Sequence, residues 1–255
     1  MTEAATLFSL AGRVALVTGA SGGLGRHFAR VLHEAGAQVA LAARRPGSVA
    51  GEVSALGARA MAVALDVTEG ASVAAALDAV EARLGPCDIL VNNAGIAATR
   101  PFLDHTAEDW DQVMAVDLRG AFLVGQAAAK RMVAAGKGGV IVNIASILAA
   151  RVIPGVAGYS AAKAGLAHLT RQMAVELARH RIRVNALAPG YVATDINRDF
   201  FESEAGQAVI RRIPQRRLGT VEDLTGPLLL LCSEAGAHMT GSVVTVDGGH
   251  SINSL

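Results

Sequence analysis

Aromatic residues are scarce in this chain. Phe, Tyr and Trp make up 4% of its 255 residues, whereas 52% of the residues are hydrophobic. The interior must therefore be filled by Ala, Val, Leu and Ile. Charged residues are also few, at 18%, which excludes a disordered or purely solvating chain. This length is sufficient for one large domain or two small ones with a sizeable core.

Cysteine is rare as well. The two cysteines, Cys87 and Cys232, lie in apolar segments and lack the spacing of metal ligands. We therefore expect buried, unreactive thiols in a reducing compartment. The seven histidines are scattered along the chain, so the sequence predicts no metal site.

Long hydrophobic runs and clusters of one charge are missing. The apolar run at 140–150 is shorter than the ~18 residues that a membrane span needs. The first residues, MTEAATLFSLAGR, carry an acid at Glu3 and no early basic region, unlike a secretory signal. We therefore expect a cytoplasmic protein that does not enter a membrane. The formal net charge is +1 and the basic pairs are dispersed, which argues against a nucleic-acid partner.

Short apolar runs alternate regularly with longer Ala/Leu-rich segments. The predicted strands are 13–19, 37–43, 59–67, 87–95, 139–146, 182–190 and 242–249, and the predicted helices are 24–36, 47–57, 70–85, 106–136, 158–180 and 221–233. Strands that are apolar throughout are buried on both faces, as in a parallel sheet covered by helices. The pattern predicts an α/β fold, a single doubly wound (Rossmann) domain over 1–255. The irregular stretch 191–220 is predicted to be a substrate lid.

Residues that directly follow the predicted strands are the candidates for ligand binding, because doubly wound folds bind ligands at the carboxyl ends of their strands. The first strand is followed by TGASGGLG, with glycines at 19, 23 and 25. A glycine-rich turn before a helix lets backbone N–H groups face a pyrophosphate. The spacing differs from G-x-G-x-x-G, and a purely structural turn is the alternative. The position after the first strand favours a dinucleotide site.

The second strand ends in Ala43 and Arg44 rather than in an acid. An acidic residue there binds the ribose 2′-OH of NAD, whereas an arginine accommodates the 2′-phosphate of NADP. NADP is therefore favoured over NAD, unless the arginine belongs to an ordinary solvent-facing pair. Asp66 and Val67 follow the third strand and NNAG (92–95) the fourth. These residues suit contact with a nucleotide, and they equally suit ordinary turns.

The pentapeptide YSAAK places Tyr159 four residues before Lys163. On a helix these two side chains share one face, and the three small residues between them leave room for a ligand. A surface tyrosine beside a solvated lysine is the alternative reading of the pentapeptide alone. Ser146 ends the fifth strand, and the dipeptide PG (189–190) ends the sixth.

In this order and at these spacings, TGASGGLG, NNAG, Ser146, YSAAK, PG and the terminal VDGG resemble the short-chain dehydrogenase/reductase family from Arg13 to Gly249. Each motif is weak alone, but the set is specific. The resemblance implies that Tyr159 is the general acid in carbonyl reduction and the base in alcohol oxidation. It implies that Lys163 contacts the nicotinamide ribose and that Ser146 hydrogen-bonds the substrate oxygen. An oligomer, usually a tetramer, is also implied.

The chemistry of these residue types supports the implied roles. A free tyrosine has a pKa near 10, too high for an efficient base at neutral pH. A lysine ammonium and a nicotinamide cation nearby both favour the phenolate. Hydride transfer leaves alkoxide character on the substrate oxygen, to which Ser146 donates a hydrogen bond while Tyr159 delivers the proton.

The resemblance also implies a set of cofactor-binding residues. Asn92 is expected to help shape the cofactor pocket; the residues predicted to bind the cofactor are Gly19, Ser21, Gly23, Leu24, Gly25, Arg44, Asp66, Val67, Asn93, Ala94, Gly95, Tyr159, Lys163, Pro189, Gly190, Val192 and Thr194.

Two positions depart from the family pattern. Asp117 stands where the family usually has an Asn that holds a water in the proton relay. An ionised carboxylate accepts hydrogen bonds but cannot donate them, so Asp117 is predicted as a catalytic residue whose part in the relay is open. Gly22 stands where many NADP-dependent relatives have a basic residue, which leaves the NADP prediction resting on Arg44.

The sequence predicts an NAD(P)(H)-dependent oxidoreductase that transfers a hydride between nicotinamide and a secondary alcohol or ketone. The first substrate prediction is a 3-oxoacyl thioester on acyl carrier protein or CoA; the alternatives are sugar-type alcohols such as gluconates and cyclic or aromatic ketones. Arg151, Arg198 and the pairs at 211–212 and 216–217 attract an acidic carrier, or they are lid charges in water. A prediction of another class is a cofactor-binding sensor without turnover, which only Asp117 supports.

Overall fold

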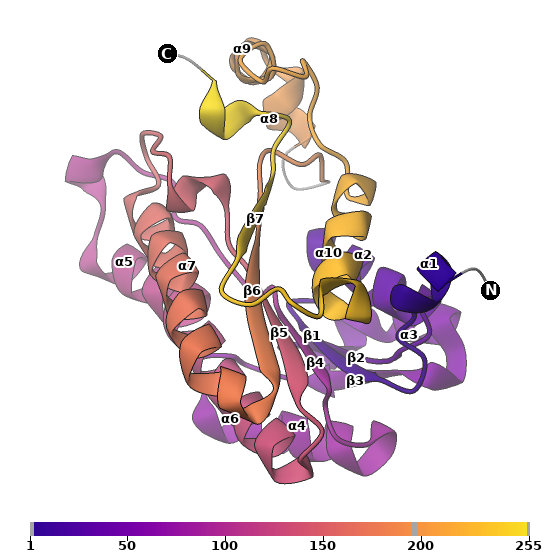
Figure 1. The fold of residues 1–255 in the computed structure, drawn as a ribbon. Helices are drawn as coiled ribbons and strands as arrows, with labels where there is room; N and C mark the ends of the chain where they lie inside the picture. The colour runs from indigo at the N-terminus through magenta and orange to yellow at the C-terminus, as the bar shows by residue number, and fades with distance from the viewer. Residues whose placement is uncertain (1–2, 195–197, 254–255) are drawn as a thin grey trace.

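The computed structural model describes residues 3–194 and 198–253 (Figure 1). These residues contain a seven-stranded sheet in the order β3-β2-β1-β4-β5-β6-β7, with every pairing parallel. The order reverses between β1 and β4, which is the doubly wound topology that the sequence predicts. The strands are β1 (Val14–Thr18), β2 (Gln38–Ala43), β3 (Ala60–Ala64), β4 (Ile89–Asn92), β5 (Gly139–Ile144), β6 (Ile182–Pro189) and β7 (Val243–Val246).

Helices cover both faces of the sheet (Figure 1). Residues of α2 and α10 form one core with the sheet, and residues of α4, α6 and α7 form the other. The main helices are α2 (Gly23–Glu34), α3 (Ala50–Leu56), α4 (Gly70–Leu84), α5 (Ala107–Val113), α6 (Ala121–Ala135), α7 (Ala157–Leu177) and α10 (Thr225–Cys232).

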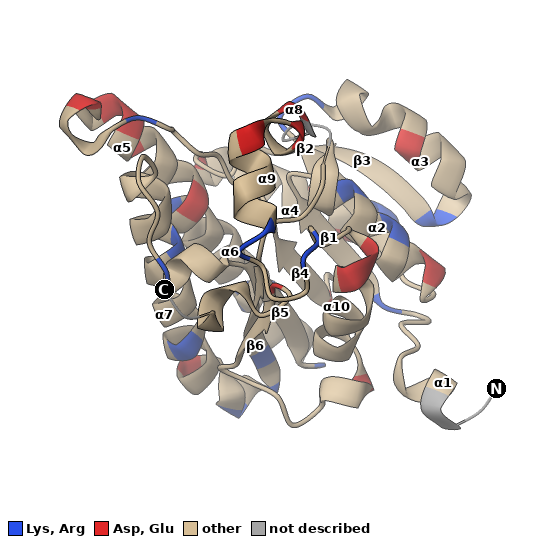
Figure 2. Cartoon of the chain, turned by 90° about the horizontal axis from the view of Figure 1, so that it is seen from above, with Lys and Arg blue, Asp and Glu red and all other residues tan. Residues whose placement is uncertain are grey.

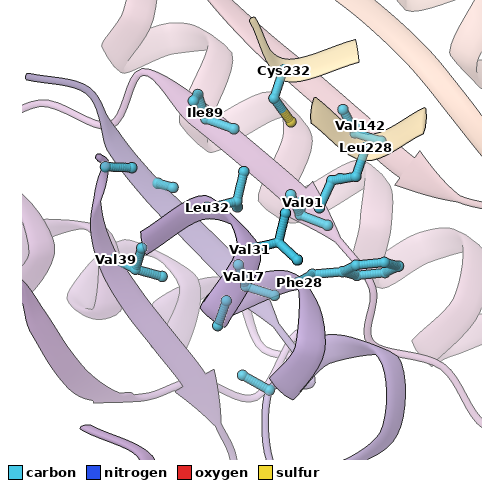
Figure 3. Close-up of a cluster of buried hydrophobic side chains, with 14 of the residues drawn as sticks. Val17, Phe28, Val31, Leu32, Val39, Ile89, Val91, Val142, Leu228 and Cys232 are labelled. Atoms are coloured by element: carbon cyan, nitrogen blue, oxygen red, sulfur yellow. The ribbon is translucent and has the colours of Figure 1, made fainter. Parts of the chain in front are cut away.

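Successive residues of β1 enter opposite cores. Ala15 and Val17 pack in the core that contains Phe28 of α2, whereas Val14 and Leu16 pack in the core on the other face of the sheet. Burial of both faces is the reason why the strands are apolar throughout. Figure 3 shows the first core, in which the labelled side chains are aliphatic except for Phe28 and Cys232.

Both cysteines lie in the interior of the protein, as the sequence predicts. Cys87 and Cys232 are buried and free, and burial raises the pKa of each thiol to about 12, which disfavours the reactive thiolate. Within the described ranges, no helix combines the length and the apolar character that crossing a membrane requires.

The long helix predicted at 106–136 is interrupted by a π-helical segment. A capping box of Thr106 and Asp109 starts α5, the segment η4 (Met114–Gly120) follows, and α6 continues to Ala135. A π-helical segment widens the helix by one residue per turn and often lies at a functional site. Apolar periodicity did not predict it, because both helix types place similar residues on the buried face.

The stretch 191–220 contains two short helices that the sequence did not predict. These are α8 (Arg198–Glu202) and α9 (Glu204–Ile210), and both lie beyond the carboxyl end of β6 (Figure 1). Ser203 caps α9 by accepting a hydrogen bond from Gly206 N at 3.2 Å. Residues 195–197 of the predicted lid, together with the Arg198 side chain, lie outside the described part of the chain. The short helix α1 (Glu3–Leu7) was also not predicted.

Candidate active site and cofactor cleft

The carboxyl ends of β1 and β4 lie side by side where the strand order reverses. Parallel pairing of Ala15 with Ile89 and of Val17 with Val91 fixes this register. The glycine loop after β1 and the NNAG segment after β4 therefore meet at one edge of the sheet, where doubly wound folds bind nucleotides. Figure 2 views the molecule from this edge and shows charged residues of both signs on the outer helices.

The glycine loop has space only for glycine at two of its positions. Gly19 has a φ of +65°, and a Cβ there would lie 2.8 Å from Ala94 Cα. A Cβ on Gly25 would lie 2.5 Å from Asn93 Nδ2 and would also strike the carbonyl of Gly19. None of the described side chains caps the first turn of α2, which starts at Gly23. Free N–H groups in a close-packed glycine turn fit the pyrophosphate of a dinucleotide.

Thr18 and Asn93 hold the glycine loop against β4. Asn93 Nδ2 donates to the carbonyls of Thr18 at 3.0 Å and Gly19 at 3.2 Å. Backbone N–H groups of Asn93 and Ala94 donate to Thr18 Oγ1, each at 3.0 Å. The sequence singled out Asn93 and Ala94 as cofactor contacts but gave Thr18 no role. One sequence feature could have indicated the role of Thr18: it is a hydroxyl residue at the end of an apolar strand, directly before the first glycine of the loop.

Arg44 and Asp66 lie near each other beyond β2 and β3. Arg44 is exposed and directly follows Ala43, the last residue of β2. Asp66 Oδ1 accepts hydrogen bonds from Thr68 Oγ1 at 2.7 Å and Thr68 N at 3.0 Å. These hydrogen bonds, with a smaller contribution from the charge of Arg44, lower the pKa of Asp66. The Asp66 side chain therefore stabilises the turn that follows β3. The neighbouring residue, Val67, is buried.

Tyr159 and Lys163 share one face of α7, as their spacing predicts. Lys163 Nζ lies 5.4 Å from the centroid of the Tyr159 ring. The lysine is 4% exposed and donates to the carbonyl of Ile144, the last residue of β5, at 3.0 Å. Ser146 follows this strand end, is buried, and accepts a hydrogen bond from Leu148 N at 3.1 Å. The fold thus brings the serine, the tyrosine and the lysine to the carboxyl end of β5.

Asp117 projects from the π-helical segment to the same lysine. Its side chain is fully buried, and its Oδ2 lies 3.1 Å from Lys163 Nζ. Its Oδ1 accepts a hydrogen bond from Ile96 N at 2.8 Å. Burial raises the pKa of Asp117, and the Lys163 charge and the Ile96 hydrogen bond oppose this rise. A Cβ on Gly95 would lie 2.8 Å from Asp117 Oδ2, so only glycine leaves room for the carboxylate.

The segment after β6 reaches over the glycine loop. Gly190 N donates to Val246 O at 2.9 Å, and Val192 forms an isolated bridge with Gly219. A Cβ built on Gly23 would be 3.9 Å from Thr194 Cγ2. A cavity of about 530 Å³ lies between the start of α2 and the α8–α9 segment; its lining includes Gly23, Arg26, Thr194, Phe201 and Leu218.

Other predicted positions have more ordinary surroundings. Asn92 is buried and donates to Ala121 O at 3.1 Å and Asn143 Oδ1 at 2.9 Å. Both amide hydrogens are thus used inside the fold, although the sequence placed Asn92 in the cofactor pocket. Ser21 is exposed on the glycine loop, and Leu24 packs against the core on the α2 face. Across residues 3–194 and 198–253, no three His, Cys, Asp or Glu side chains gather as metal ligands would.

Comparisons with known proteins give the family. A family model described as "Enoyl-(Acyl carrier protein) reductase" matches residues 19–251. The 2-dehydro-3-deoxy-D-gluconate 5-dehydrogenase of Escherichia coli (strain K12) is 41% identical over 95% of this chain and 96% of that protein. The gluconate 5-dehydrogenase of Gluconobacter oxydans (strain 621H) is 40% identical over 97% of this chain and 98% of that protein.

A solved structure agrees with these relatives. The gluconate 5-dehydrogenase of Burkholderia cenocepacia J2315, in complex with NADP and tartrate, has a TM-score of 0.94 and 39% identity, covering 99% of this chain and 100% of that chain. The protein therefore belongs to the short-chain dehydrogenase/reductase family and is an NAD(P)-dependent oxidoreductase that acts on CH–OH groups.

Proposed function

We propose that this protein is an NADP(H)-dependent dehydrogenase of a sugar-type secondary alcohol, with a gluconate-like sugar acid or its keto form as substrate. The observation that carries the proposal is the similarity over nearly the whole chain to proteins named as gluconate-type dehydrogenases. This similarity favours the sugar-type alternative over a 3-oxoacyl thioester, the first prediction from the sequence.

Tyr159, Lys163 and Ser146 are the proposed catalytic residues. NADP(H), when bound, supplies or accepts the hydride. In carbonyl reduction Tyr159 gives its hydroxyl proton to the substrate oxygen, and in alcohol oxidation the phenolate takes that proton back. Ser146 donates a hydrogen bond to the same oxygen as negative charge develops on it. The buried ammonium of Lys163, 5.4 Å from the tyrosine ring, favours the phenolate.

The glycine loop and Arg44 are the proposed cofactor contacts. Gly19, Gly23 and Gly25 let the pyrophosphate approach the first turn of α2. Arg44, exposed beyond β2 where no acid stands, suits a 2′-phosphate. The gluconate 5-dehydrogenase of Burkholderia cenocepacia was solved with NADP, which supports the preference for the phosphorylated dinucleotide.

Basic side chains near the β5–α7 loop suit an acidic substrate. Arg151 donates to Ser251 O at 3.2 Å, which joins this loop to the C-terminal turn. Burial lowers the pKa of His250; the Asp247 carboxylate opposes this change, and the charges of Arg151 and Arg212 add to it. Arg151 and Arg212 therefore lie near His250 and Asp247, and their guanidinium groups would attract a substrate carboxylate. We propose that α8 and α9 form the lid over this substrate.

A second apolar hollow supports the proposal of a homo-oligomer. A cavity of about 730 Å³ lies between the η4–α6 helix and α7; its lining includes Leu118, Phe122, Gly165, His168 and Leu169. Phe122 is 41% exposed there. Exposed apolar patches of this kind commonly pack against a second subunit, and we propose that a second copy of this chain covers it.

The test of the proposed function is a cofactor titration followed by a substrate panel. The purified protein is titrated with NADPH and NADH by fluorescence, and the panel then compares a gluconate and its keto form with a 3-oxoacyl thioester and a cyclic ketone. We expect tighter binding of NADPH, turnover of the sugar acid, and loss of turnover but not of cofactor binding in Tyr159→Phe. Preferred turnover of the thioester would overturn the substrate proposal. Cofactor binding with no turnover of any compound would instead indicate that the protein is a cofactor-binding sensor and not an enzyme.

A further inference from the structure

Asp117 is a buried carboxylate that points at the lysine of the proposed catalytic group. Its side chain has no exposed surface, and its Oδ2 lies 3.1 Å from Lys163 Nζ. A charge in the protein interior is stable only when it is paired and hydrogen-bonded. Asp117 meets both conditions, because Lys163 faces one oxygen and the N–H of Ile96 donates to the other at 2.8 Å.

We propose that Asp117 is ionised against Lys163 and that it offsets the charge with which the lysine favours the Tyr159 phenolate, so that alcohol oxidation requires a more alkaline pH than with a neutral residue at position 117. This inference rests on the proposed role of Tyr159. Asp117 is then a positioning residue, since it acts on the tyrosine through Lys163.

The groups that contact the two oxygens of Asp117 favour the ionised carboxylate. Ile96 N donates a hydrogen bond to Oδ1, whereas Oδ2 has no hydrogen-bond partner among the described residues and faces the Lys163 ammonium as an ion pair at 3.1 Å. A protonated carboxyl group would have to turn a hydrogen toward an acceptor, and among the described residues neither partner offers one. The absence of a side chain at Gly95 preserves this arrangement, because a Cβ there would lie 2.8 Å from Asp117 Oδ2 and 3.3 Å from Lys163 Nζ.

Few other charges face Asp117. On α7 the groups are Lys163 and, beyond it, Tyr159. The segment after β4 contributes only the backbone N–H of Ile96. On η4 itself, Arg119 points to the carbonyl of Thr68, to which it donates at 2.8 Å. Among the described residues, the charge that balances Lys163 therefore comes from Asp117.

The residue at position 117 sets the net charge that Tyr159 faces. With a neutral Asn at position 117, the tyrosine would face one uncompensated positive charge. With an ionised Asp, it faces a pair of zero net charge. Tyr159 is half-buried, and in such a site a unit charge several ångströms away changes an ionisation midpoint by about one pH unit. Asp117 therefore keeps the hydroxyl form of Tyr159, which is the proton donor in carbonyl reduction, up to a higher pH.

Because the chain has two tyrosines, the ionisation of Tyr159 can be measured without substrate or cofactor. The sequence contains only Tyr159 and Tyr191, and burial raises the pKa of Tyr191. In a Tyr191→Phe background, the ultraviolet absorbance of tyrosinate reports Tyr159 alone. The blank is the double variant with Tyr159→Phe, and circular dichroism over the same pH range verifies that each protein stays folded.

We expect Asp117→Asn in this background to move the tyrosinate midpoint to lower pH by about one unit. Asp117→Ala provides a second variant, because it removes the same charge together with the acceptor for Ile96 N; it should move the midpoint in the same direction. A midpoint that stays in place or rises in both variants would overturn the inference.

Kinetics separate this inference from the proposed function. The acid limb of the pH–rate profile for alcohol oxidation should shift to lower pH in Asp117→Asn by the same amount as the absorbance midpoint. If Tyr159→Phe is inactive but the profile and the midpoint of Asp117→Asn do not move, the inference is wrong and the proposed function stands. If Tyr159→Phe retains full turnover, the proposed function is wrong, while the absorbance titration still decides whether Asp117 opposes ionisation of the tyrosine.

Discussion

The side-chain amide of Asn93 donates to the carbonyl of Gly19 across 3.2 Å. This hydrogen bond joins the segment after β4 to the first residue of the glycine loop. The same amide donates to Thr18 O at 3.0 Å, so the loop is held at two successive carbonyls. The shape of the proposed pyrophosphate site is therefore set by a neighbouring strand as well as by the loop glycines.

A methyl group at Gly25 should disrupt this arrangement. Its Cβ would lie 2.5 Å from Asn93 Nδ2 and would strike the carbonyl of Gly19. We expect Gly25→Ala to weaken NADPH binding by about tenfold or more, and to lower the melting temperature, because overpacking costs about 1–3 kcal/mol. Fluorescence titration and thermal unfolding measure the two effects.

Gly22→Ala is the matched control for this substitution. It lies in the same loop, but a Cβ there has no atom within 4 Å, and its φ of −173° is open to any residue. We expect it to bind NADPH within about twofold of the wild type, since only open space is filled. Equal losses in the two variants would show that steric contact with Asn93 is not what requires glycine.

Arg44 should decide the preference between the two dinucleotides. A charge-assisted contact with a 2′-phosphate contributes about 1.5–3 kcal/mol, so Arg44→Gln should weaken NADPH binding by about tenfold or more and leave NADH binding nearly unchanged. Arg45→Gln is the control, because it removes the charge of an adjacent exposed arginine that does not directly follow β2. Equal effects on both dinucleotides would contradict a specific phosphate contact.

The strands and the principal helices could be predicted from sequence because their pattern is continuous. Each strand is an apolar run bounded by glycine or polar residues, and both faces of β1 are buried as that pattern requires. The i, i+4 spacing of Tyr159 and Lys163 likewise predicted that the two side chains share one face of a helix. In contrast, α8 and α9 are short helices that depend on local caps such as Ser203, and hydrophobic periodicity carries little signal over so few residues.

Other features of the site depend on contacts between distant segments. Asn92 and Asn93 are adjacent, yet one amide lies in the interior and bonds Asn143, while the other bonds Gly19. Alternation along a strand sends neighbours to opposite sides, but the sequence does not say which side faces the ligand. The direct contact of Asp117 with Lys163 arises from the π-helical segment, which apolar periodicity did not predict.

Glu52 should make folding stability depend on pH in the acid range. Arg30 Nε and Nη2 donate to its two oxygens at 2.5 and 2.7 Å, and this pairing is the main cause that lowers the pKa of Glu52. A lowered carboxyl pKa stabilises the fold above about pH 4.5, the ordinary value, and this contribution is lost as the pH falls through the lowered value.

We therefore expect Glu52→Gln to lower the free energy of unfolding at pH 7 by about 1 kcal/mol, a modest value because the Arg30 side chain is 53% exposed and solvent screens the pair. The difference from the wild type should shrink as the pH falls below about 4.5, as measured by urea unfolding at pH 7 and at several acid pH values. Glu81→Gln is the control: it removes a partner of Arg131 on the surface, and Asp78 still pairs with that arginine at 2.6 Å. A loss that is independent of pH would mean that Glu52 acts by packing and not by charge.

Phe122 should be required for self-association. Its ring is 41% exposed beside the apolar hollow between α6 and α7, where the proposed second copy of the chain would bury it. Replacing it with a charged side chain places an unpaired charge in that interface, which is strongly unfavourable. We expect Phe122→Arg to reduce the molar mass measured by light scattering to that of a smaller species, with the circular dichroism spectrum unchanged. Leu103→Arg is the control, because Leu103 is 93% exposed on the short helix at 102–104, outside α6 and α7. The oligomer proposal is wrong if the wild type is monomeric or if both variants keep its mass.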